Sequence, residues 1–442
     1  MALSLRAEKL AAPGPNFLLT EVLPNLYDGA ANPGGWVNLG VAENSLMHEA
    51  LLAHLHAHLR VPGAALTYGD GCKRLRRAAA RFLTRQLRPV TPVEAAHVLV
   101  SNGCTPAIEN LAWAVANPGD GILIGRPYYG AFPADVSRRT GVDLIPLSFG
   151  ARDPMGLEAV DEHEAAILAA KQRGQRIAAL ILAHPHNPLG RCYPRAVLVA
   201  YMRLCQRHQV HLICDEIYAL SVFESRVDAA ADAAAQPVPF ESVLAIDPAG
   251  IVDPALVHVL WGMSKDFGAN GLRLGFTVSQ HSAAMRAALQ GVFEFTWTSS
   301  LSDLVAAAIL EDDAWVEAYI RENQRRLAEH HAKVVAWARE HAVEHAPGAN
   351  AGFFVWVNLG AVYRRHHPDE EVADIDAVVM ASLLEHRIFL ADGVRFGAEQ
   401  PGWFRIIFTL EAAYLEMGLQ RIVAAIKGTS LQLPYETNGV KE

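Results

Sequence analysis

The sequence predicts an α/β protein built on a mostly parallel sheet that helices cover on both faces. Continuous apolar runs of strand length recur between residues 96 and 279, and such runs are typical of strands that are buried on both faces. Stretches with helical spacing separate these runs, which indicates parallel strands joined by helical crossovers. The length of 442 residues leaves room for a second, smaller domain.

The strand-like runs of the large domain cover residues 96–101, 120–125, 177–185, 210–216, 256–263 and 272–279. The helical pattern is clearest at 106–117 and 195–208. The first of these helices has Thr105 at its N-cap position and Pro106 in its first turn. This order of residues is typical of a helix start.

The pattern changes after about residue 300. Residues 301–345 are helical and charged, and strand-like runs follow at 352–359, 387–393 and 403–410. This mixture predicts a smaller α+β domain. We therefore expect three parts: an N-terminal segment (1–44) that packs on the small domain or on a partner, a large domain (45–315), and a small C-terminal domain (316–442).

Composition limits the possible partners. Hydrophobic residues make up 51% of the chain and charged residues 19%, with a formal net charge of -9 and no basic block, which argues against binding to nucleic acid. No apolar run reaches the length of a membrane span. The five cysteines form no CxxC pair, as expected in a reducing compartment. We expect a cytoplasmic protein without a signal peptide.

His54 and His58 would lie on one face of a helix and could suggest a metal site. No carboxylate or cysteine completes a ligand set around them. A solvated helix face is therefore the simpler interpretation, and we expect no metal ligands.

The stretch LWGMSKDFGANGLRLGF (260–276) places Lys265 and Arg273 among glycines and apolar residues. One interpretation is a surface turn with two solvated charges. The other is functional, because a partly desolvated lysine loses its proton readily and forms Schiff bases, and an arginine fork binds phosphate.

Other strand ends carry residues that suit the same ligand, although each also has an ordinary structural explanation. Thr105 begins a helix whose free N–H groups suit an anion. Tyr129 could stack on a planar ring, and Asn187, held extended before a proline, offers an amide donor. Asp215 follows a buried strand, where a carboxylate is costly unless it is paired. Together they describe a pyridoxal-phosphate site with Lys265 as the Schiff-base lysine.

These motifs resemble those of the fold-type-I pyridoxal-phosphate enzymes of the class I/II aminotransferase superfamily. The chain is most similar to the branch of 1-aminocyclopropane-1-carboxylate (ACC) synthases and their fungal and animal relatives, which include C–S lyases and aminotransferases. The motifs are NLGVAENSL (38–46), LTYGDG (66–71), SNGCTPAIE (101–109), RPYYGAF (126–132), HPHNPLG (184–190), DEIY (215–218), SKDFGANGLRLG (264–275) and PGWFR (401–405). The resemblance implies a seven-stranded sheet in the large domain.

The resemblance also implies roles around the cofactor ring. Lys265 would hold pyridoxal phosphate as an internal aldimine and later move the α-proton, and Asp215 would pair with the ring nitrogen. Asn187 and Tyr218 would contact the ring hydroxyl, and Tyr129 would stack on the ring. We expect Lys265, Asp215 and Tyr129 to be the catalytic residues.

Further roles concern the phosphate and the substrate. The residues that would hold the phosphate are Gly103, Cys104, Thr105, Ser264 and Arg273. Tyr68 would reach the phosphate from the partner subunit of a homodimer. Arg405 would bind the α-carboxylate of an amino-acid substrate by a bidentate pair, with Glu43 and Asn187 also near the substrate.

Three positions depart from the pattern. Gly262 stands where a serine is usual, Cys104 where alanine is usual, and Ser45 where plant ACC synthases carry glutamine. Without the serine hydroxyl, phosphate binding depends more on Arg273. The departures bear on ACC formation more than on cofactor binding.

We expect an enzyme that forms an external aldimine with an α-amino acid and removes its α-proton. The first hypothesis is ACC-synthase-like lyase chemistry by β- or γ-elimination, such as C–S bond cleavage in specialised metabolism. The second is an aminotransferase that exchanges the amino group with a 2-oxo acid. A third, from another class, is a catalytically silent binding or scaffold protein, against which Lys265, Asp215 and Arg405 argue.

Overall fold

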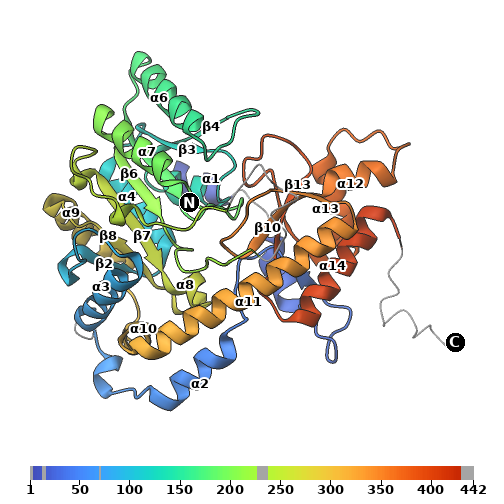
Figure 1. Ribbon diagram of the computed structural model, residues 1–442, viewed down its shortest axis with the longest axis horizontal. Coiled ribbons are helices and arrows are strands. Elements are labelled where there is room, and N and C mark those ends of the chain that lie inside the picture. The colour runs from blue at the N-terminus through green and yellow to red at the C-terminus, as the bar shows by residue number, and fades with distance from the viewer. Residues whose placement is uncertain (1–2, 12–15, 69–70, 226–236, 430–442) are drawn as a thin grey trace.

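A mostly parallel sheet of seven strands forms the centre of the larger part of the molecule (Figure 1). The computed structural model describes residues 3–11, 16–68, 71–225 and 237–429. The strands are β2 (Val98–Ser101), β3 (Gly121–Gly125), β4 (Asp143–Leu147), β5 (Ile177–Ala183), β6 (His211–Asp215), β7 (Val257–Gly262) and β8 (Gly275–Val278). Their order is β2-β8-β7-β6-β5-β3-β4, and β8 runs antiparallel to both of its neighbours. The predicted fold class is confirmed.

Helices cover both faces of this sheet, so its strands are apolar on both sides. In β6, Leu212 and Cys214 face one core and Ile213 faces the other, which explains why the strands read as unbroken apolar runs. The first core includes α3 (Lys73–Leu87), α6 (Leu157–Gln172), α7 (Arg195–His208) and α10 (Ser300–Glu311). The second includes α4 (Cys104–Val115), α5 (Phe132–Ser137) and α9 (Ala283–Phe293).

The C-terminal part of the chain has its own sheet and core. Its antiparallel strands lie in the order β12-β13-β10-β9, with β9 at Glu344–His345, β10 at Phe354–Asn358, β12 at Ala391–Asp392 and β13 at Trp403–Ile407. Three helices pack there: α12 (Leu359–His366), α13 (Ile375–Glu385) and α14 (Ala412–Lys427). Part of the N-terminal segment joins them, because β1 (Val37–Asn38) pairs with β11 (Ile388–Phe389).

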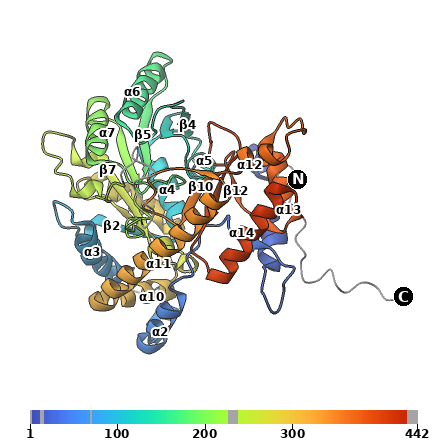
Figure 2. The same ribbon diagram turned by 45° about the vertical axis from the view of Figure 1, so that its right-hand side comes forward.

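One long helix, α11 (Asp313–Glu340), belongs to both parts of the molecule (Figure 2). Near its start, Tyr319 and Ile320 pack in the large core, whereas Leu327 and Val334 pack in the core of the C-terminal part. The boundary predicted at residues 315–316 falls inside this helix, and the division into domains stays a prediction.

Some local expectations differ from the structure. The strand β4 was missed by the sequence analysis, and the run predicted at 272–279 becomes a strand only from Gly275. On α2 (His48–His58), the predicted solvated position holds for His58, which is exposed. It is wrong for His54, whose ring is buried and stacks on Trp315 at 4.0 Å between centroids. Among the described helices, none combines the length and the apolar character needed to cross a bilayer.

Candidate active site

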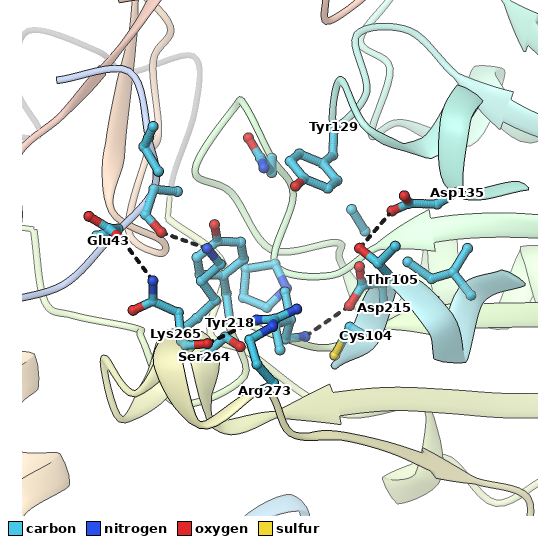
Figure 3. Close-up of a pocket in the computed structure, with 18 residues that line it drawn as sticks. Glu43, Cys104, Thr105, Tyr129, Asp135, Asp215, Tyr218, Ser264, Lys265 and Arg273 are labelled. Carbon is cyan, nitrogen blue, oxygen red and sulfur yellow. Dashed lines mark hydrogen bonds between the residues drawn. The ribbon is translucent and has the colours of Figure 1, made fainter. Parts of the chain in front are cut away.

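A cavity of about 210 Å³ lies at the carboxyl ends of β5, β6 and β7 (Figure 3). Ligands commonly bind at this edge of an open α/β sheet. Ten residues that the sequence analysis singled out line the cavity: Glu43, Cys104, Thr105, Tyr129, Asn187, Asp215, Tyr218, Ser264, Lys265 and Arg273. Segments far apart in the sequence therefore meet at one place, as the motifs predicted.

Lys265 enters the cavity from α8 (Met263–Asp266), a helix of four residues that directly follows β7. Its Nζ donates a hydrogen bond of 2.6 Å to the backbone carbonyl of Ala42. Burial, and then the positive charge of Arg405, lower the pKa of Lys265 to about 8. A substantial fraction of this amine is therefore neutral near physiological pH, the form that attacks an aldehyde.

Asp215 is the last residue of β6, and its side chain is 6% exposed. Burial raises the pKa of Asp215 to about 7, and a hydrogen bond of 3.2 Å from the backbone N–H of Ile217 to Oδ1 opposes that rise. A cationic partner in the cavity would stabilise the ionised carboxylate.

One end of the cavity is suited to an anion. It contains the N-terminus of α4, which begins at Cys104, together with Ser264 and Arg273. Gly103 has φ 121°, and a Cβ there would lie 2.5 Å from Nη2 of Arg273. The φ of 121° is a conformation that favours glycine, and it brings the backbone close to this guanidinium, next to the N–H groups that a helix start leaves unpaired.

Arg405 lies behind the cavity wall rather than among its lining residues. It is 3% exposed, and its guanidinium carbon lies 4.7 Å from the ring centroid of Phe396 and 5.3 Å from that of Phe354. Nη1 donates to Oδ1 of Asn187 at 3.0 Å and Nη2 to the carbonyl of Gly40 at 2.8 Å. Among the described residues, its buried Nε has no hydrogen-bond partner, so the guanidinium keeps donor capacity for a carboxylate.

Tyr68 does not line the cavity, because its side chain is 92% exposed. The contact expected for Tyr68 is with the cofactor of the partner subunit. The motif that contains it also includes residues 69–70, which lie outside the described residues.

Two polar residues of the cavity were missed. Asp135 on α5 accepts a hydrogen bond of 3.3 Å from Thr105 Oγ1, and burial raises its pKa to about 6. Asn270 donates from Nδ2 to Oε1 of Glu43 at 2.7 Å and so fixes that carboxylate. Figure 3 shows Glu43 and Asp135 on opposite sides of the cavity. Asn270 lies within the motif SKDFGANGLRLG (264–275) but was given no role there, and Asp135 lies just beyond the motif RPYYGAF (126–132).

The sequence was compared with protein families and with curated proteins. The family described as aminotransferase class I and II matches residues 35–422. A cattle (Bos taurus) protein named 1-aminocyclopropane-1-carboxylate synthase-like protein 1 is 33% identical over 91% of this chain and 78% of its own length. The rice (Oryza sativa subsp. japonica) 1-aminocyclopropane-1-carboxylate synthase 3 is 34% identical over 91% and 89%. A probable aminotransferase of Aspergillus fumigatus, gliI, is 32% identical over 87% and 88%.

Among solved structures, a double mutant of the aspartate aminotransferase of Thermus thermophilus superimposes with a TM-score of 0.70. The alignment covers 96% of this chain and all of the other, at 20% sequence identity. At this identity the likeness concerns the fold, which is that of aspartate aminotransferase.

Proposed function

The chain belongs to the class I and II aminotransferase family, and from this premise we propose that it uses pyridoxal phosphate to eliminate a β- or γ-substituent from an α-amino acid. The observation that carries the proposal is the meeting of Lys265, Asp215 and Arg273 in one cavity. We propose further that the protein acts in the cytoplasm as a homodimer in which Tyr68 completes the partner's site.

The residues present fit pyridoxal phosphate. Arg273, Ser264 and the start of α4 supply positive charge and donors for a phosphate group. Asp215 is a buried carboxylate that suits a protonated ring nitrogen, and Lys265 offers an amine of lowered pKa, part of which is neutral near pH 7, for an aldehyde. We propose that Asn187 and Tyr218 hold the ring hydroxyl and that Tyr129 stacks on the ring.

The cofactor, when bound, supplies an electron sink for negative charge that forms on the substrate α-carbon. We propose that Nζ of Lys265 removes the α-proton, since its pKa of about 8 lets it accept a proton near neutral pH. The ionised Asp215 keeps a positive charge favourable at the far side of the ring. Arg405 would orient the substrate by binding its α-carboxylate.

The charges of the cavity indicate what kind of side chain the substrate carries. Glu43 presents a carboxylate that Asn270 holds in place. Among the described lining residues, the cationic ones are Lys265 and Arg273, and we assign both to the cofactor. A second substrate carboxylate would find repulsion from Glu43 rather than a partner, so the cavity favours a neutral or cationic side chain.

This preference supports elimination over transamination with dicarboxylic acids such as glutamate and 2-oxoglutarate. The names of the cattle and rice relatives point the same way. The name of the Aspergillus relative favours the second candidate, an aminotransferase. The two reactions differ in whether a 2-oxo acid must accept the amino group.

The experiment that separates them supplies cysteine S-conjugates or S-adenosylmethionine to the purified protein, with and without a 2-oxo acid. We expect turnover without the oxo acid, with pyruvate and ammonia released from the cysteine conjugates. Lys265→Ala is the control and should abolish turnover. Turnover that stops unless an oxo acid is present would show an aminotransferase. A protein that takes up no pyridoxal phosphate and stays colourless would point to the silent scaffold.

A further inference from the structure

A buried carboxylate lies directly next to Lys265 in the sequence. Asp266 is the last residue of α8 and is 1% exposed. Its Oδ2 accepts hydrogen bonds from Trp261 Nε1 at 2.8 Å and from the backbone N–H of Leu220 at 3.1 Å. Its Oδ1 accepts one from Ser221 Oγ at 2.7 Å. Three donors therefore converge on one side chain that does not line the cavity.

These donors belong to two separate segments that reach the active site. Trp261 lies on β7, the strand that leads into α8. Leu220 and Ser221 follow Tyr218, which lines the cavity, in a turn where the N–H of Ser221 bonds the carbonyl of Tyr218. The carboxylate of Asp266 thus ties the helix of Lys265 to the turn of Tyr218.

The turn is also attached to the rest of the molecule. The carbonyl of Leu220 accepts a hydrogen bond of 3.0 Å from Gln324 Nε2 on α11. The carbonyl of Ser221 accepts one of 2.8 Å from the N–H of Gly352, just before β10. Through this turn, α8 is connected to the long helix α11 and to the segment just before β10 in the C-terminal part.

The short helix depends on these contacts. With four residues, α8 has almost no internal hydrogen bonding and cannot fix the direction of a side chain alone. Loss of the Asp266 carboxylate would leave the indole N–H of Trp261 and the N–H of Leu220 buried without an acceptor, which is costly. A movement of α8 that exposes these N–H groups to water would lower that cost.

Resting on the proposed role of Lys265, we propose that Asp266 is a positioning residue: its three hydrogen bonds hold the Lys265 amine at a fixed, desolvated place opposite Tyr218 and Asp215. Asp266 itself touches neither substrate nor cofactor.

Hydrogen bonding and charge can be told apart with two substitutions. Asp266→Ala removes all three acceptor contacts. Asp266→Asn removes the charge but keeps the contacts, because its amide oxygen can face Trp261 and Leu220 while its NH2 donates to the Ser221 hydroxyl, which also accepts. The position of the amine should therefore survive in the asparagine variant and be lost in the alanine variant.

The readout is the protonation of Lys265 in cofactor-free protein. Lysines are dimethylated with isotope-labelled formaldehyde and a borane reductant, and the resonance that disappears in Lys265→Arg is titrated with pH by NMR. In Asp266→Ala we expect the pKa of Lys265 to rise by about one unit or more, since the amine gains water. Removal of a negative charge alone would lower it, so a rise reports movement. In Asp266→Asn we expect a change below about 0.3 unit.

Kinetics supply a second readout. In Asp266→Ala we expect kcat to fall about tenfold or more with KM little changed, because the group that moves the proton is displaced while the substrate carboxylate site is intact. Asp266→Asn should recover most of kcat. The matched control is Tyr201→Phe, which removes a buried contact of 3.3 Å between Tyr201 on α7 and His163 on α6. This variant should change neither the pKa of Lys265 nor kcat.

Trp261→Phe removes the indole N–H that bonds Asp266 but keeps an aromatic side chain. It replaces Asp266→Ala in the test if the alanine variant does not fold. It should shift the pKa of Lys265 in the same direction by a smaller amount. The proposal is overturned if the folded alanine variant, or Trp261→Phe in its place, keeps the wild-type pKa of Lys265 and the wild-type kcat. It is also overturned if Asp266→Asn changes the pKa of Lys265 and kcat as much as Asp266→Ala does. The titration needs no cofactor, so it does not depend on the proposed function. If the proposed function is wrong, the wild-type protein would show a lowered pKa of Lys265 but no turnover.

Discussion

Nη1 of Arg405 donates a hydrogen bond of 3.0 Å to Oδ1 of Asn187, and this contact joins a buried cation to the wall of the cavity. Since Oδ1 of Asn187 is occupied by Arg405, its Nδ2 is directed to serve as the donor toward a ligand. In the proposed function, Arg405 binds the substrate carboxylate and Asn187 the cofactor, so these two roles would fall to residues that hold each other in place.

Replacement of Arg405 by lysine should weaken substrate binding. A point charge cannot reproduce the planar fork that bonds Asn187, Gly40 and a carboxylate together. We expect a loss of about 2–3 kcal/mol, or roughly 30- to 150-fold in kcat/KM, measured by steady-state kinetics.

Arg421→Lys is the control, because Arg421 is also buried and donates to backbone carbonyls of Gly35 and Arg387, away from the cavity. It should lower the melting temperature and leave kcat/KM intact. An unchanged kcat/KM in Arg405→Lys would contradict the assignment.

Capture of pyridoxal phosphate by the cofactor-free protein should depend on pH through Lys265. Its pKa of about 8, below the ordinary lysine value because of burial and Arg405, predicts that the neutral amine increases up to pH 8 and then levels off. The rate of capture, followed by absorbance after rapid mixing, should rise about tenfold per pH unit well below 8 and flatten above it. A rate that keeps rising toward pH 10.5 would show an ordinary, solvated lysine.

A serine at position 262 should destabilise the protein, although it would restore the residue usual in the resembling family. A Cβ on Gly262 would lie 2.7 Å from the carbonyl oxygen of Leu274 and 3.0 Å from Sγ of Cys104. We expect Gly262→Ser to lose about 1–3 kcal/mol in urea unfolding, with part of it recovered when Cys104→Ala is added. Gly291→Ser, where a Cβ meets nothing within 4 Å, is the control. A loss no larger than that of the control would exclude the steric coupling.

The proposed homodimer can be tested with hybrid dimers. If Tyr68 acts in the partner's cavity, a dimer of one Lys265→Ala chain and one Tyr68→Ala chain contains one site with both defects and one intact site. Random mixing of two nearly inactive variants should then recover about a quarter of wild-type activity, since half of the dimers are hybrids with one good site. Absence of recovery in mixtures that sedimentation shows to exchange subunits would place Tyr68 outside the partner's site.

Much of this architecture is readable from the sequence because the central strands are buried on both faces. The strand β4 was missed for the opposite reason: it is a sheet edge, DLIPL is only partly buried, and it contains Pro146, which weakens a strand pattern. The division of α11 between two cores was not visible either, because its periodicity shows an apolar face but not the partner of each half.

The site was predictable where its residues sit at strand ends and within motifs. Asp135 lies outside the motifs, and Asn270 lies inside one but was given no role. Both were missed because their importance comes from contacts across the fold, with Thr105 and Glu43 respectively. The packing of Arg405 against the rings of Phe354 and Phe396 likewise depends on tertiary structure.

The shared helix α11 has a mechanical consequence. Its 28 residues make a stiff rod of about 42 Å, anchored at its N-terminal end beside the ring of Phe267 through Tyr319. A tilt of about 5° at Tyr319 would move the C-terminal end of the helix, about 32 Å away, by about 3 Å. Because Leu327 and Val334 of this helix pack in the core of the C-terminal part, such a tilt would carry that core with it and change the angle between the two parts of the molecule.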